Sequence, residues 1–171
     1  MKSWTFLGTL AGAVAALLAA GALATGSSTV KAGACNANDF AAHMREIPGS
    51  AGAGSISYRL SLTNTGSKAC KLGNFARLQL EKADGKDLPT HVHQVGTPAT
   101  ITVAADATAS APLRFSPDIP GPGEPRRGPC EPRASLVVVT LLYPSSGSTV
   151  AQVRPKTSVC SHGSIQEKPL H

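Results

Sequence analysis

The chain has 171 residues, a formal net charge of +6 and only 4% aromatic residues. This charge is modest, and no basic cluster with interleaved aromatic side chains indicates a nucleic-acid site, so we do not expect nucleic acid as a partner. With so few aromatic rings, a core must be built from Val, Leu, Ile and Ala, and disulfides would offset that limited supply.

The first residues have the pattern of an export signal. Lys2 is followed by an uncharged, small and apolar run that ends in Ala22-Leu23-Ala24, with small residues at the two positions that signal peptidase reads. We expect a signal peptide over 1–24, a flexible arm over 25–34 and a single secreted domain over 35–171. The apolar run is short and rich in Gly and Ala, so we expect cleavage rather than a retained membrane anchor, and no membrane span afterwards.

The clearest strand pattern covers residues 55–63, in which Ile, Tyr and Leu residues alternate with polar ones. It ends at a turn in which we expect Gly66 to adopt a positive φ. The preceding segment 36–47 is ambiguous, because its apolar residues alternate as in a strand, whereas Asn38 or Asp39 is suited to cap a short helix. We prefer the strand, since the rest of the chain has an all-β pattern.

Further short strands follow, separated by turn residues. We predict them at 75–82, 88–95, 99–103, 108–115, 135–142 and 149–153, with a short strand or tail at 164–170. Asp84-Gly85 is typical of a hairpin turn, and 116–133 is a long loop because it holds six prolines and three glycines. Strand 135–142 has apolar residues at both its odd and its even positions, so both of its faces are apolar. We expect both faces to be covered rather than one exposed as a patch. Seven or eight short strands at this spacing predict an antiparallel Greek-key β-sandwich.

Four cysteines in an exported chain indicate two disulfides. Cys35 and Cys70 bracket one predicted pair of strands, and Cys130 and Cys160 bracket another, so each pair reaches disulfide distance if the strands pair as hairpins. We therefore predict the disulfides Cys35–Cys70 and Cys130–Cys160. No Cys/His spacing typical of a structural zinc site is present.

Several of these segments together resemble a known family. They are Gly54-Ser55 before a strand, LSLTNTGSKAC, the Asp84-Gly85 turn, TITVAADATASAPLRF, Cys130, SLVVVTLLYP and Cys160. The resemblance, which covers Cys35 to Leu170, is to an actinobacterial secreted family catalogued as a domain of unknown function, DUF4232. It implies an exported, immunoglobulin-like β-sandwich and brings no known activity, so no catalytic residue is carried over. The chain departs from the family at Ala105-Asp106, where Pro-Gly is usual, and the type of that turn stays open.

Two groups of polar residues are candidates for binding. His91 and His93 would point to one face of a strand, close enough to share a Cu²⁺ or Zn²⁺ ion, but no third ligand is evident and a solvated face is the simpler interpretation. Arg126, Arg127 and Arg133 in the long loop are suited to phosphate or carboxylate groups of a wall polymer, against the simpler interpretation of a solvated loop.

The sequence lacks the common serine-hydrolase, zinc-protease and phosphate-loop motifs. We therefore expect no enzyme, no catalytic residue and no cofactor. The expected function is that of an exported, monomeric, non-catalytic β-sandwich module that binds an unidentified partner or polymer at or near the cell envelope. The alternative is an extracytoplasmic metal-binding protein that uses His91 and His93.

Overall fold

The computed structural model describes residues 31–171, so the expected signal peptide and most of the expected arm lie outside the described residues. The described part contains eleven strands. They are β1 (Gly33–Ala34), β2 (Phe40–Glu46), β3 (Ile56–Asn64), β4 (Cys70–Gly73), β5 (Ala76–Glu81), β6 (His91–Gln94), β7 (Thr100–Val103), β8 (Thr108–Phe115), β9 (Ala134–Leu141), β10 (Ser148–Thr157) and β11 (Ser164–Glu167). The helical elements are a 3-10 turn, η1 (Ala37–Asp39), and α1 (Cys160–Gly163). Within residues 31–171, no helix is long and apolar enough to cross a membrane.

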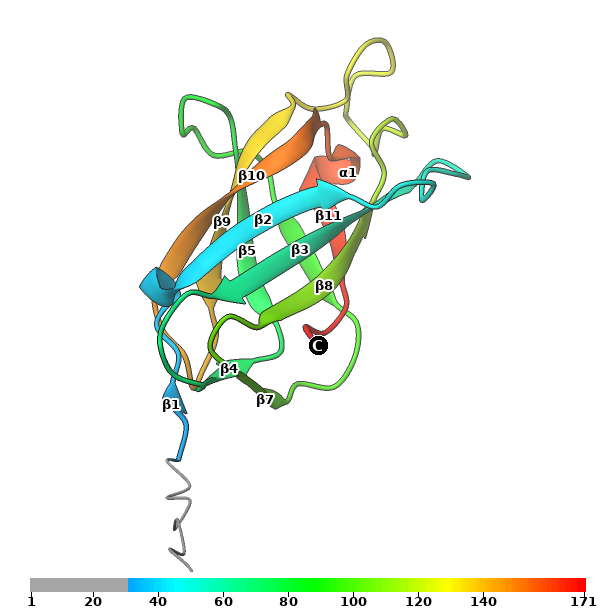
Figure 1. Ribbon diagram of the computed structural model, residues 1–171. Coiled ribbons are helices and arrows are strands. Elements are labelled where there is room, and N and C mark those ends of the chain that lie inside the picture. Colours follow the sequence, from blue (N-terminus) through cyan, green and yellow to red (C-terminus); the bar gives the residue numbers. More distant parts are fainter. Residues whose placement is uncertain (1–30) are drawn as a thin grey trace, which may run out of the picture. The chain divides into compact units, whose positions relative to one another are not determined.

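Eight of the strands form one sheet, in the order β5-β9-β10-β2-β3-β8-β11-β6. β2, β3 and β8 cross the front of the view with β5 behind them, so the sheet curls around its own core (Figure 1). Alternate residues of each strand face that core. In β3, for example, Tyr58, Leu60 and Leu62 are buried, as the alternation predicts.

The pairing is mixed. β10 pairs with β2, β11 with β6 and β1 with β4 in parallel, whereas the other pairs are antiparallel. The all-β class, the two sheets and the two disulfides confirm the predicted fold class. The strand count is eleven rather than seven or eight, and the sheet is not purely antiparallel. Alternation within one strand shows which side faces the core, but it does not show which strand lies beside it.

A second, three-stranded sheet has the order β1-β4-β7. Gly33 and Ala34, which we expected in the flexible arm, pair with Cys70 and Lys71 of β4. Neither β1 nor β4 was predicted, because strands of two and four residues are too short to show alternation.

Asn64 organises the turn that follows β3. Its buried side-chain amide donates to the carbonyl oxygens of Lys68, Val103 and Ala104, at 2.9, 3.2 and 3.1 Å. Its side-chain oxygen accepts a hydrogen bond from the Gly66 N–H at 3.0 Å. Gly66 does not adopt the positive φ that we expected; instead, a Cβ at this position would lie 3.1 Å from Asn64 Oδ1. Close approach to Asn64 therefore favours glycine here.

Two further turns contain a residue in the left-handed region. Gly85 has a φ of +78° and its N–H donates to the Lys82 carbonyl at 3.1 Å, which fits the predicted turn. In the turn where the chain departs from the resembled family, Asp106 has a φ of +59°, a conformation that Asp tolerates better than most residues. The Asp106 N–H donates to the backbone carbonyl of Asn64 at 2.9 Å, which links this turn to the one after β3.

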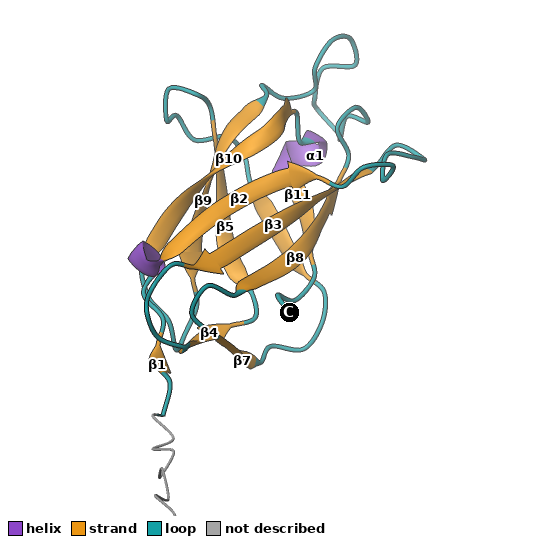
Figure 2. Cartoon of the chain, viewed as in Figure 1, coloured by secondary structure: helices purple, strands orange, loops and turns teal. Residues whose placement is uncertain are grey.

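Both predicted disulfides are present. The Cα atoms of Cys35 and Cys70 are 4.9 Å apart, and those of Cys130 and Cys160 are 5.5 Å apart. The first disulfide joins the chain after β1 to β4. The second joins the loop 116–133 to α1, and this loop extends from the same end of the sheet as the loop 48–55 (Figure 2).

Side chains bridge the two edges of the curled sheet. The Ala76 N–H of β5 donates to Glu167 Oε1 of β11 at 3.0 Å, and Gln94 Nε2 of β6 donates to the Ala76 carbonyl at 3.3 Å. Glu167 is fully buried. Burial raises the pKa of its carboxyl group to about 7, although the hydrogen bonds from Ala76 and Gln94 act in the opposite direction. The carboxyl group of Glu167 thus accepts the hydrogen bond from the Ala76 N–H that a backbone carbonyl of a neighbouring strand would otherwise accept.

Candidate functional site

Three arginines lie side by side across neighbouring strands. The register places Arg45 of β2 opposite Arg59 of β3 and beside Arg154 of β10. All three are exposed and occupy the outward positions of their strands. Directly opposed residues on one face of a sheet have Cβ atoms about 4.5–5.5 Å apart. The row therefore concentrates three positive charges on the outer face of the sheet.

Two further cations lie on the same outer face, near this row. Arg114 of β8 pairs with Ser57 of β3, and Lys168 directly follows β11. Both are exposed. We call the set Arg45, Arg59, Arg114, Arg154 and Lys168 the basic face.

Acidic side chains do not neutralise the basic face. The five strands β10, β2, β3, β8 and β11 hold two acidic residues, Glu46 and Glu167. Glu167 is buried, and Glu46 lies on the same, core-facing side of β2 as the buried Met44. Among residues 31–171, no carboxylate lies at ion-pair distance from a cation of the basic face. The face therefore presents an uncompensated positive potential to solvent.

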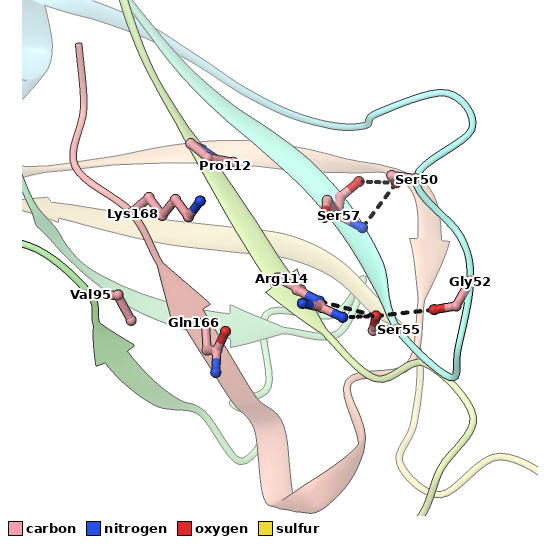
Figure 3. Close-up of a pocket in the computed structure, with 9 residues that line it drawn as sticks. All are labelled: Ser50, Gly52, Ser55, Ser57, Val95, Pro112, Arg114, Gln166 and Lys168. Carbon is pink, nitrogen blue, oxygen red and sulfur yellow. Dashed lines mark hydrogen bonds between the residues drawn. The ribbon is translucent and has the colours of Figure 1, made fainter.

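A hollow of about 370 Å³ lies at one end of the basic face. Its lining is Ser50, Gly52, Ser55, Ser57, Val95, Pro112, Arg114, Gln166 and Lys168. Figure 3 shows the side chains of Arg114, Gln166 and Lys168 around one space beside β8. The lining has two cations, four polar side chains and no carboxylate, a composition that suits an anionic group.

Serine side chains hold this hollow in shape. Ser55 Oγ accepts hydrogen bonds from Arg114 Nε at 3.1 Å and Nη2 at 2.8 Å, and it donates to the Gly52 carbonyl at 3.2 Å (Figure 3). Ser50 Oγ bonds both the N–H and the carbonyl of Ser57 at 3.0 Å. A guanidinium group has five N–H donors, so Arg114 keeps others for a ligand.

A second hollow lies further along the basic face. It has a volume of about 450 Å³ and is lined by Ala42, His43, Arg45, Val150, Gln152 and Arg154. Arg154 Nε donates to Gln152 Oε1 at 2.9 Å, which orients this guanidinium along its own strand. Cations thus border two separate hollows on the same outer face.

The sequence model of one family, Domain of unknown function (DUF4232), matches residues 35–171. The chain belongs to this family. Neither a search of curated proteins nor a search of solved structures finds a match. The DUF4232 domain contains both disulfides and every strand except β1, and the description of the family assigns it no activity.

The loop arginines of this DUF4232 domain lie outside the strands that carry the basic face. Arg126, Arg127 and Arg133 are all exposed in the segment between β8 and β9. Among residues 31–171, none of them forms an ion pair with a carboxylate. Arg133 borders a shallow hollow together with Lys156. A role for these arginines in binding stays a prediction.

The two histidines singled out in the sequence lie on β6, at the edge of the larger sheet of the DUF4232 domain. His91 pairs with Ser164 and His93 with Gln166, and both imidazoles are exposed. Within the described part of the chain, neither histidine belongs to a group of three side chains whose ligand atoms converge. The fold therefore adds no third ligand to this pair.

The sequence did not reveal the basic face, although it contains the relevant signal. Arg45, Arg59 and Arg114 each occupy a polar position in a predicted alternating strand. Their alignment depends on the register between strands, which only the fold supplies.

Proposed function

We propose that this DUF4232 domain is an exported, non-catalytic module that binds an anionic partner or polymer at or near the cell envelope through its basic face. The row Arg154, Arg45 and Arg59 carries the proposal. Like charges directly opposite one another in a sheet are destabilising. A guanidinium group binds phosphate and carboxylate through paired hydrogen bonds, so an anion along the row would relieve that repulsion.

Two observations support export. The chain begins with the sequence pattern of a signal peptide. Its four cysteines form two disulfides, which are typical of proteins in oxidising compartments outside the cytoplasm.

The distribution of charge favours a ligand with repeated negative groups. The cations of the basic face are spread over β10, β2, β3, β8 and the residue after β11. A single small anion contacts only one or two of them, whereas a polyanion contacts the row and both hollows together. Binding through many exposed cations is expected to weaken as salt concentration rises.

Two double variants with equal changes in charge test the proposal. Arg45→Gln/Arg59→Gln removes two charges from the basic face, and Arg126→Gln/Arg127→Gln removes two from the loop. The probes are polyphosphate and polygalacturonate, with neutral dextran as a control, and affinity is measured by calorimetry at low salt. We expect the first variant to weaken polyanion binding at least about tenfold and the second about twofold or less.

The opposite ranking would contradict the proposal. If the loop variant lost binding while the Arg45→Gln/Arg59→Gln variant kept it, the loop would be the contact surface. If neither polyanion bound the wild-type protein more tightly than dextran, the basic face would not be an anion site.

A further inference from the structure

Three metal-ligating side chains converge where the loop 116–133 meets α1. They are Glu124, Glu131 and His162, whose ligand atoms all lie within 4.8 Å of one another. His162 Nδ1 is 3.8 Å from Glu124 Oε1 and 3.9 Å from Glu131 Oε1. In Figure 1 the loop and α1 lie beside each other at the same end of the sheet.

The hydrogen bonds of the imidazole fix which nitrogen faces the carboxylates. His162 Nε2 is 2.9 Å from the Pro122 carbonyl oxygen. A carbonyl oxygen can only accept, so Nε2 carries a proton, and in the neutral ring Nδ1 presents its lone pair to Glu124 and Glu131. A histidine that binds a metal almost always donates its other ring N–H in this way.

Glu124 is held rigidly as a carboxylate. Its side chain is 2% exposed, and its oxygens accept hydrogen bonds from the backbone N–H groups of Gly121 at 2.6 Å, Ser161 at 2.9 Å and His162. Burial by itself raises the pKa of Glu124, but the three backbone N–H groups, together with the positive charge of the His162 ring when it is protonated, outweigh it, so the pKa lies below its usual value. Each carboxylate oxygen has two lone pairs, so Oε1 retains one for a further partner.

The second disulfide brings the other two side chains to Glu124. Glu131 follows Cys130, and His162 lies two residues after Cys160, so the disulfide connects both segments directly. Ser161 and His162 both adopt left-handed backbone, with φ of +56° and +55°. Consecutive non-glycine residues in this region are costly and persist where the surroundings impose them, as they often do at binding sites.

We propose that Glu124, Glu131 and His162 form a binding site for a divalent transition-metal ion, for which Zn²⁺ is the best match. Two carboxylate oxygens and one imidazole nitrogen are ordinary zinc ligands, and a water molecule would complete the tetrahedron. Zinc bonds of about 2.0–2.2 Å place tetrahedral ligand atoms roughly 3.4 Å apart. His162 Nδ1, at 3.8 and 3.9 Å from the two Oε1 atoms, must therefore approach each of them by about half an ångström. His162 is 52% exposed and Glu131 17% exposed, so both side chains have room to make this adjustment.

The proposed metal site differs in every residue from the pair His91 and His93. It lies in the loop and α1 rather than on β6, and it does not rest on anion binding by the basic face. A bound ion would join the loop 116–133 to α1 by a second link beside the disulfide Cys130–Cys160.

Zinc titration of the purified protein, with both disulfides formed, tests this site. Zn²⁺ is added in competition with a chromophoric chelator, and the histidine ring nitrogens are followed by NMR. We expect one Zn²⁺ per chain, a shift of the His162 Nδ1 resonance, and a protonated Nε2 that is retained. His162→Gln and Glu131→Gln should each weaken binding at least about tenfold, whereas His91→Gln/His93→Gln should leave it unchanged.

Three results would overturn the proposal: no saturable binding at about 1 mM free Zn²⁺, binding that survives His162→Gln, or binding that is lost in His91→Gln/His93→Gln. Urea denaturation without metal checks that each variant is folded. If His162→Gln does not fold, Glu131→Gln decides the matter alone, because Glu131 has no hydrogen bond from its side chain within residues 31–171.

Discussion

Arg45 of β2 lies directly opposite Arg59 of β3, on the outer face of the larger sheet. Arg154 of β10 continues the same row, and no acidic side chain on this face compensates the three charges. Each arginine alone would be an ordinary exposed residue of a strand. Their alignment is the feature that distinguishes this face and that connects the fold to the proposed anion binding.

Replacing Arg59 should stabilise the free protein while it weakens polyanion binding. Arg59→Gln removes a like-charge pair, and we expect the free energy of unfolding at low salt to rise by about 0.2–1 kcal/mol, with the difference shrinking at high salt. Urea denaturation at two salt concentrations measures this. Arg77→Gln on β5, opposite Thr140, is the matched control and should change little. A destabilised Arg59→Gln variant would show that the row is not repulsive.

Glu167 should make the protein less stable as the pH rises. Its pKa is about 7 in the folded state, above the ordinary value of 4.5, so its favourable contribution is complete below about pH 4.5 and is lost as the pH rises through 7. Between pH 5 and pH 8 this group should lower the free energy of unfolding by roughly 2–3 kcal/mol.

Glu167→Gln should remove that decline. The amide oxygen still accepts from the Ala76 N–H, but no charge is buried, so the variant should exceed the wild type in stability at pH 8. Urea midpoints at pH 5 and pH 8 measure the effect. Glu81→Gln, a half-buried glutamate of β5 that lacks these hydrogen bonds, should keep the wild-type decline. An equal pH dependence in wild type and Glu167→Gln would refute this role for Glu167.

Asn64→Ala should be strongly destabilising. The substitution removes the side-chain donor to the carbonyl oxygens of Val103 and Ala104, of which Ala104 keeps the hydrogen bond from the Ala107 N–H. We expect a loss of at least about 2 kcal/mol in the free energy of unfolding. Thermal and urea denaturation measure it, with Asn38→Ala as an exposed control. A loss as small as that of the control would mean that the turn after β3 does not depend on this side chain.

The two disulfides should contribute similarly to stability but differ in their effect on zinc binding. Removal of either by paired Cys→Ala substitution should cost roughly 2–4 kcal/mol, because the two cysteines of each pair are separated by similar lengths of chain, 35 and 30 residues. Only loss of Cys130–Cys160 should also weaken zinc binding, since this disulfide positions Glu131 and His162. Zinc binding that weakens equally without Cys35–Cys70 would argue against that local role.

The sequence was informative wherever the signal is local. Alternation in β3 predicted its buried residues, and the spacing of the cysteines around paired strands predicted both disulfides. Pairing between distant parts of the chain was not accessible, because a strand pattern has no information on its neighbour. The parallel contact of β10 with β2 is such a case, and the arginine row depends on it.

The convergence of the side chains in the proposed metal site could not be predicted from the sequence for the same reason. The sequence pattern singles out only His91 and His93 as candidate metal ligands. The structure brings another histidine, His162, to Glu124 and Glu131, through a disulfide and two left-handed residues. The left-handed backbone of Ser161 and His162 could not be predicted from the sequence, because neither residue is Gly, Asn or Asp, the residue types that most commonly adopt it.

The most direct test of the basic face is an NMR titration of the isotope-labelled protein with polyphosphate at low and high salt. The account predicts that the backbone and guanidinium resonances of Arg45, Arg59 and Arg154 shift together at low salt and return as salt is added. Shifts confined to residues 116–133, or no shifts at all at saturating polyphosphate, would contradict it.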